Sequence, residues 1–208
     1  LGFTQEEIQA IATRDGVRGV MPAYSADCFM QTERDGNIIV HALSRDINAS
    51  EENENYLNRP VLKEGRLPQA SGECVVEHGK FSAASCQIGD KISLFLEEGS
   101  LENTLRCTEY TVVGIVESSQ YISFTRGNCL IGDGKIDLFI MLPLQDFMLE
   151  VYTDAYLTLK DTKGLSPFSD RYKDTVNTYA EETELFAAEQ AQKRYSELAQ
   201  IVQEEIDK

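Results

Sequence analysis

The chain has 208 residues, of which 42% are apolar and 26% are charged, a balance typical of a folded globular protein and not of a disordered one. Its formal net charge of -16 excludes nucleic acid as a partner, because phosphate binding depends on clustered Lys and Arg. The longest apolar run, near residues 138–142, is far too short to cross a membrane. Since the chain opens at Leu1 without a leader, we expect it to be part of a longer protein.

The first expected element is a short amphipathic helix. Thr4 stands where an N-cap is needed, and Glu7 follows three residues later, which is the capping-box pattern. Residues 17–44 then show an alternating pattern, and the sequence RDGN at residues 34–37 predicts a hairpin between two strands. Residues 45–59 are polar and acidic, so they predict an exposed loop.

The middle of the chain predicts further short strands separated by turn residues. Together they indicate a β-rich, mostly antiparallel region. The strands are expected at residues 91–96, 110–116, 138–141 and 155–159.

The five cysteines are scattered, with no CxxC pair and no histidine at metal-ligand spacing. Single cysteines of this kind are most often small buried apolar residues. One disulfide, between Cys74 and Cys86, is the alternative that the spacing leaves open.

The C-terminal part predicts one long helix. Ser166 and Pro167 form an N-cap and first-turn pair, and no Gly or Pro interrupts residues 168–208. Such a helix would extend roughly 60 Å, so we expect it to project from the domain. Its first half carries one apolar stripe, Tyr172, Val176, Tyr179 and Phe186. Its second half carries a heptad-like apolar seam, which predicts a coiled-coil partner outside this chain: Ala188, Ala191, Tyr195, Leu198 and Val202.

The sequence contains no pattern of catalytic or metal-binding residues. The histidines, His41 and His78, have no partner ligand at i+4, and the GxSxG, HExxH, GxxxxGK[ST] and GxGxxG motifs are absent. Acidic pairs are too common in this chain to single out an acid and a base. We therefore expect no enzyme activity, no cofactor and no metal.

Five segments in a fixed order carry a family resemblance. They read VLKEGRLPQASGECVV, QIGDKISLFL, EYTVVGIVESSQYIS, DLFIMLPLQDF and VYTDAYLTLKD. This order resembles the extracytoplasmic domain of FtsX/MacB-type ABC transporter permeases. The motif residues that carry the resemblance are Gly65, Arg66, Pro68, Gly72, Glu73, Gly89, Asp90 and Gly114.

The resemblance implies an α+β fold with two lobes. Residues 1–60 and 150–208 would form a membrane-proximal, porter-like lobe that ends in the long helix. Residues 61–149 would form an inserted β-rich lobe of the type called Sabre. The motif residues would then shape the turns of the inserted lobe, with no role in binding or catalysis.

The resemblance also implies a place and a set of partners. The domain would lie on the extracytoplasmic side of the cell membrane, joined to its own transmembrane helices outside this fragment. Its partners would be an ABC ATPase subunit, a second or sister permease, and an extracellular protein, peptide or lipid. Its role would be to couple ATPase-driven motion to export or to a mechanical signal. The alternative is a secreted or surface adhesion module that oligomerises through its terminal coiled coil.

Overall fold

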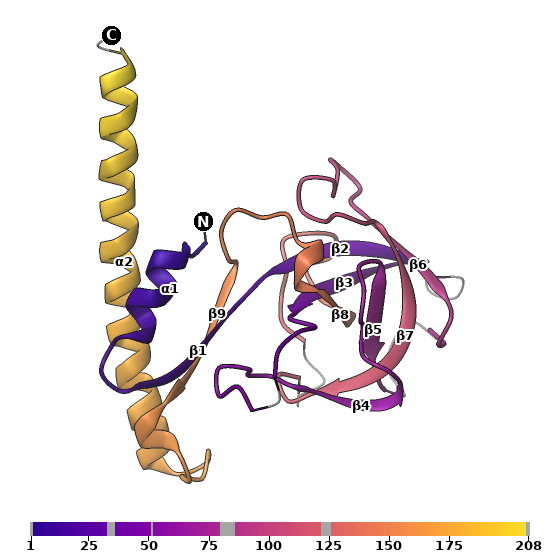
Figure 1. Cartoon of the computed structure of the whole chain (residues 1–208), viewed down its shortest axis with the longest axis horizontal. Coiled ribbons are helices and arrows are strands. Elements are labelled where there is room, and N and C mark those ends of the chain that lie inside the picture. Colours follow the sequence, from indigo (N-terminus) through magenta and orange to yellow (C-terminus); the bar gives the residue numbers. More distant parts are fainter. Residues whose placement is uncertain (1, 33–35, 51, 80–85, 122–125, 207–208) are drawn as a thin grey trace. The chain divides into compact units, whose positions relative to one another are not determined.

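The computed structural model describes residues 2–32, 36–50, 52–79, 86–121 and 126–206 (Figure 1). The fold is α+β with mostly sheet, as predicted, and it contains one long C-terminal helix. The helices are α1 (Gln5–Ala12) and α2 (Asp170–Ile206), with short 3-10 turns at Leu144–Asp146 and Lys160–Thr162. The strands are β1 (Val17–Ala23), β2 (Ser25–Thr32), β3 (Gly36–Arg45), β4 (Pro60–Gly65), β5 (Glu73–Glu77), β6 (Lys91–Phe95), β7 (Glu109–Ser118), β8 (Leu138–Pro143) and β9 (Asp154–Leu159).

The first helix and the first hairpin form where the sequence predicted them. The Thr4 N–H donates to Glu7 Oε2 at 2.8 Å, and the Glu7 N–H donates to Thr4 Oγ1 at 3.3 Å, which is the predicted capping box. β2 and β3 pair antiparallel as a hairpin, from Ser25 opposite Leu43 to Thr32 opposite Gly36. Most of the predicted RDGN turn, residues 33–35, lies outside the described residues.

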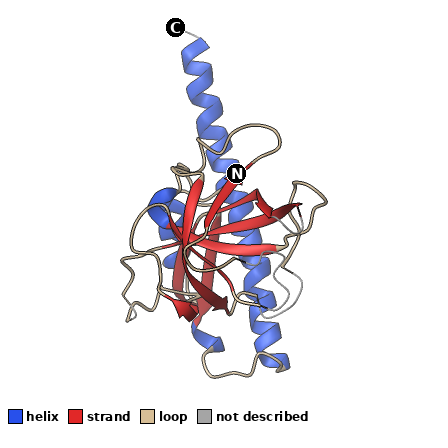
Figure 2. Cartoon of the chain, turned by 90° about the vertical axis from the view of Figure 1, so that its right-hand side faces the viewer, coloured by secondary structure: helices blue, strands red, loops and turns tan. Residues whose placement is uncertain are grey.

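Most of the described strands close into a barrel. In the larger sheet the order is β4-β7-β5-β8-β3-β2-β6, and β6 also pairs with β7. The pairing of β6 with β7 therefore completes a ring of six strands, to which β4 adds an outer edge. Two pairs, β3 with β8 and β5 with β7, are parallel, and the other pairs of this sheet are antiparallel. Figure 2 shows these strands, in red, wrapped around a common interior.

β8 is buried on both of its faces, whereas β6 alternates between exposed and buried residues along most of its length. Successive side chains of a strand point to opposite faces. In β8, Leu138, Ile140 and Leu142 belong to one buried cluster, whereas Phe139 and Met141 belong to another. The first and larger cluster fills the interior, and the second lies on the outer face. A strand buried on both faces reads as a continuous apolar run, as LFIML does.

The described chain forms two compact units. The larger unit contains residues 1–8 and 20–156, and the smaller unit contains residues 9–19 and 157–208. β2 and β3 are part of the barrel and belong to the larger unit. The lobe boundaries that the resemblance implies stay a prediction, as do the porter-like and Sabre-like identities of the lobes.

Two local expectations need correction. The long helix begins at Asp170, and its N-cap is Ser169, whose Oγ accepts from the Tyr172 N–H at 3.3 Å. Ser166 instead begins the preceding turn, because the Ser169 N–H donates to its carbonyl at 3.0 Å. The cysteines need no such correction, because Cys28 and Cys74 are buried free thiols and Cys86 is free as well, so the alternative of a disulfide between Cys74 and Cys86 is not found.

The second correction concerns the polar segment 45–59. It is not uniformly exposed, since Arg45 and Tyr56 are buried. Arg45 is the last residue of β3, and its side chain lies over the Tyr56 ring.

Candidate functional site

The motif glycines allow two strands to approach closely at the edge of the barrel. Gly65 of β4 lies opposite Gly114 of β7. A Cβ atom on Gly114 would come within 2.3 Å of the Arg66 carbonyl oxygen, and one on Gly65 would come within 2.3 Å of the Val113 carbonyl oxygen. Gly65 also has a φ of +73°, which L side chains rarely adopt. Only glycine fits at either position without moving the backbone.

Arg66 and Glu73 close the loop between β4 and β5. Both guanidinium Nη atoms donate to the Glu73 carboxylate, Nη1 to Oε2 at 2.7 Å and Nη2 to Oε1. The Gln69 N–H donates to the same carboxylate at 2.9 Å. The hydrogen bonds from Arg66 outweigh the partial burial of the carboxyl and lower the pKa of Glu73 to about 2. Pro68 is buried within this loop.

The remaining motif residues attach two turns to the backbone of β7. The Gly72 carbonyl accepts from the Thr111 N–H at 2.8 Å, and the Gly89 N–H donates to the Val112 carbonyl at 2.8 Å. Asp90 Oδ2 accepts from the Gln87 N–H at 2.8 Å and so closes its own turn. The motif glycines, Arg66, Glu73 and Asp90 therefore meet around β7, and the charged groups among them bind each other or the backbone.

The apolar seam lies on a part of α2 that the described chain leaves uncovered. Tyr195 is 69% exposed, Leu198 56% and Val202 58%. Ala188 and Ala191 are exposed as well. The described side chains from residue 195 to residue 206 are all exposed. The structure thus places the seam on one helix and the motif residues in the other compact unit.

The first half of α2 is covered by residues of its own unit, through a contact that the sequence did not indicate. The Arg14 guanidinium lies 5.0 Å from the centre of the Phe186 ring and 5.4 Å from that of Tyr179. The Tyr179 hydroxyl donates to the Asp15 carbonyl at 2.5 Å, and Arg14 Nη1 donates to Thr183 Oγ1 at 3.4 Å. An arginine just after a short helix has no pattern that would reveal this contact.

The two histidines are in ordinary polar pairs. His41 Nδ1 lies 2.6 Å from Asp27 Oδ1, and His78 Nδ1 lies 3.3 Å from Glu117 Oε1. Within the described residues, no three His, Cys, Asp or Glu side chains come together as metal ligands. None of the described helices combines the length and the apolar character that a membrane crossing needs.

Comparison with known proteins gives structural neighbours only. No protein-family model matches the sequence, and no curated protein matches it. The extracellular domain of YknZ, a noncanonic ABC-type transporter from Gram-positive bacteria, is similar at 12% identity over 77% of this chain and 76% of that one, with a TM-score of 0.43. The periplasmic region of MacB from Actinobacillus actinomycetemcomitans is similar at 12% identity over 90% of this chain and 75% of that one, with a TM-score of 0.44. MacB-type permeases are also the class that the sequence motifs resemble.

Proposed function

We propose that this chain is the extracytoplasmic domain of an ABC transporter permease subunit and that α2 relays motion between the membrane and the domain. The observation that carries the proposal is the uncovered apolar seam on the second half of a 37-residue helix. A helix of this length reaches about 55 Å at 1.5 Å per residue. The ordered motif segments of the sequence supply the transporter class.

The two stripes of α2 give it two different neighbours in this proposal. Tyr179 and Phe186 face residues 9–19 of the same unit, through the contacts of Arg14 and Asp15. With 3.6 residues per turn, the seam lies roughly 150° around the helix from them. One face therefore holds the helix in its own unit, and the seam is left for a second permease copy or a sister permease. Paired helices of this kind move as rigid elements, which suits them to transmit a displacement.

The proposal assigns no catalysis to this chain. ATP hydrolysis would occur on a separate ATP-binding subunit, and this domain would respond to it. The motif residues would keep the loops of the barrel in place. A cargo or an extracellular signalling partner would contact the larger unit.

Charge placed on the seam tests the coupling role. Substituting Leu198→Asp together with Val202→Asp puts two carboxylates into the helix interface, where burial of an unpaired charge is costly. We expect transport or signalling by the intact permease to be abolished while the domain stays folded. The matched control is Gln192→Asp with Ser196→Asp, which places the same charges, four residues apart, on another exposed face.

Cysteine cross-linking identifies the neighbour of the seam. In membranes that carry the full-length permease, Leu198→Cys should cross-link to a second helix, whereas Ser196→Cys should not. A cross-link to a transporter chain supports the proposal. Normal transport by the Leu198 and Val202 double variant, together with an absent cross-link, contradicts it. A cross-link between copies that lack any ATPase partner favours the adhesion module instead.

A further inference from the structure

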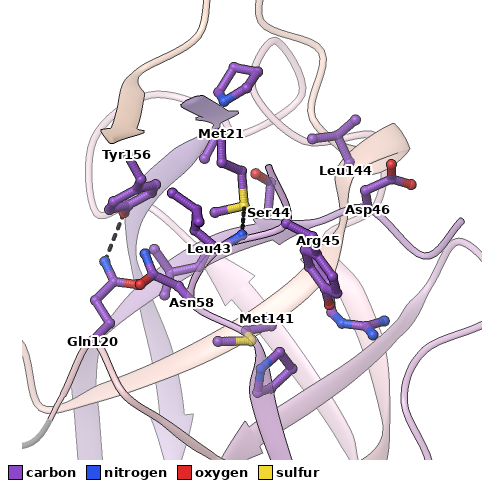
Figure 3. Close-up of a pocket in the computed structure, with 15 residues that line it drawn as sticks. Met21, Leu43, Ser44, Arg45, Asp46, Asn58, Gln120, Met141, Leu144 and Tyr156 are labelled. Atoms are coloured by element: carbon purple, nitrogen blue, oxygen red, sulfur yellow. Dashed lines mark hydrogen bonds between the residues drawn. The ribbon is translucent and has the colours of Figure 1, made fainter. Parts of the chain in front are cut away.

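A small cavity lies within the larger unit, beside the C-terminal ends of β3 and β8 (Figure 3). Its volume is about 50 Å³. Met21, Leu57 and Met141 give it apolar walls, and Ser44 and Arg45 add polar groups. Methionine is a flexible side chain that adapts to the shape of what it contacts. The cavity therefore combines apolar walls with one strong cation.

The cation is a buried arginine with one enclosed and unpaired nitrogen atom. Arg45 is only 9% exposed. Its Nε atom is enclosed and has no hydrogen-bond partner, and among the described residues its guanidinium forms neither a hydrogen bond nor an ion pair. The Arg45 Cζ atom lies 5.7 Å from the centre of the Tyr56 ring, in a cation–π contact. Within the part of the chain that the structure describes, no carboxylate pairs with this guanidinium.

A second arginine approaches the same ring. The Arg59 Cζ atom lies 5.2 Å from the centre of the same Tyr56 ring. Arg59 is held by the backbone, since its Nε donates to the Tyr56 carbonyl and its Nη2 to the Asn53 carbonyl, both at 2.9 Å. Asp46 also lines the cavity, but its carboxylate accepts from the Asn48 N–H at 2.9 Å and is exposed. The enclosed and unpaired Nε–H of Arg45 is therefore the donor that this cavity offers to an acceptor.

The chemistry of the cavity selects the kind of anion. A guanidinium cannot lose its proton in a protein, so its burial is costly unless an anion or other acceptor meets it. Its planar set of N–H donors matches a carboxylate. A volume of about 50 Å³ holds such a group with a few carbon atoms and excludes a drug-sized ligand.

We infer that this cavity binds a carboxylate joined to a short aliphatic group, with Arg45 as the anion-binding residue and the methionines as the apolar walls. The source is either a small organic acid or the carboxylate of a peptide. This inference does not rest on the proposed permease function, because it depends only on side chains of the larger unit.

The test is a titration of the full 208-residue chain followed by NMR, with the backbone amides and the arginine Nε–H signals observed. The probes are isobutyrate, a short peptide ending in Ala with a free C-terminus, and the same peptide with an amidated C-terminus. Phosphate and chloride at equal ionic strength are the competing anions. We expect saturable shifts of Arg45 Nε–H and of the Leu57 amide with isobutyrate, and no shift with the amidated peptide.

Two variants separate binding by Arg45 from a general effect of charge. Arg45→Met keeps the length of the side chain and should weaken isobutyrate binding by about tenfold or more. Arg18→Met removes the same charge from an exposed position on β1 and should leave binding unchanged. If Arg45→Met does not fold, Arg45→Lys retains the charge without the planar donors and should bind more weakly.

Each result decides the inference or the source of the ligand. Binding of isobutyrate alone indicates a small organic acid, and binding of the free-carboxylate peptide as well indicates a peptide source. The absence of saturable shifts overturns the inference. So does equal or tighter binding of phosphate, or equal binding by the amidated peptide or by Arg45→Met.

Discussion

The close approach of β4 and β7 predicts a defined order of stability among three glycine-to-alanine variants. Gly72 has a φ of +79°, but a Cβ there meets nothing within 4 Å. The stability lost in Gly72→Ala therefore comes only from the backbone conformation. Gly114 has an ordinary φ, but its Cβ would lie 2.3 Å from the Arg66 carbonyl oxygen and 3.0 Å from that of Glu64. Gly65 combines a positive φ with a 2.3 Å approach to the Val113 carbonyl oxygen.

The expected losses in the free energy of unfolding follow from these geometries. A left-handed conformation costs a non-glycine residue roughly 1–2 kcal/mol, part of which is offset because alanine restricts the unfolded chain. We therefore expect a loss of about 1 kcal/mol for Gly72→Ala. Gly114→Ala must push β4 away from β7 and weaken bonds such as that from the Arg66 N–H to the Val113 carbonyl, at 2.9 Å. Overpacking and one weakened hydrogen bond together cost about 3 kcal/mol.

Gly65→Ala carries both penalties, so we expect about 4 kcal/mol. The measurement is urea unfolding followed by tyrosine fluorescence, since the chain contains no Trp, with hydrogen exchange of the β7 amides as the local readout. A Gly114→Ala variant that is no less stable than Gly72→Ala would refute the close approach of β4 and β7.

Three further predictions concern single side chains. Arg66 lowers the pKa of Glu73 to about 2, so the contribution of this carboxylate to stability is present above pH 4.5 and is lost as the pH falls toward 2. Glu73→Gln should therefore be less stable than the parent at neutral pH. In pH-dependent unfolding, the difference in stability between the two proteins should disappear over this range. Arg14→Met should loosen α2 from residues 9–19 by about 1 kcal/mol, seen as faster hydrogen exchange in the first half of α2, and unchanged exchange would contradict the ring contacts. Burial raises the pKa of Cys28 to about 12 and also raises that of Cys74. Both thiols should therefore react with a thiol reagent only when the chain unfolds. Rapid modification of either thiol in the folded chain would contradict their burial.

Most of the local structure could be predicted from the residues themselves. The capping box of Thr4 and Glu7 predicted α1, and the strands expected at residues 110–116 and 138–141 correspond to β7 and β8. These signals are local, because a cap involves residues three positions apart and a strand pattern repeats every second residue. The motif glycines were also noticeable in the sequence, since glycine is favoured wherever the backbone must turn or approach closely.

The tertiary structure alone decided which of these elements meet. The pairing of β6 with β7 closes the barrel, and the parallel pairing of β3 with β8 joins the β2–β3 hairpin to strands that come much later in the sequence. The contact of Arg14 with Tyr179 joins residues that are far apart in the sequence. Such contacts depend on how the apolar surfaces pack, and no short pattern encodes them.

The segment 45–59 shows the same limit most clearly. By composition it is a polar loop, yet the structure buries Arg45 against Tyr56, and no described carboxylate pairs with its guanidinium. Composition determines which residues prefer water on average. Whether one particular charge is enclosed depends on the walls that Met21, Leu57 and Met141 bring to it from three separate parts of the chain, and only the folded protein brings them together.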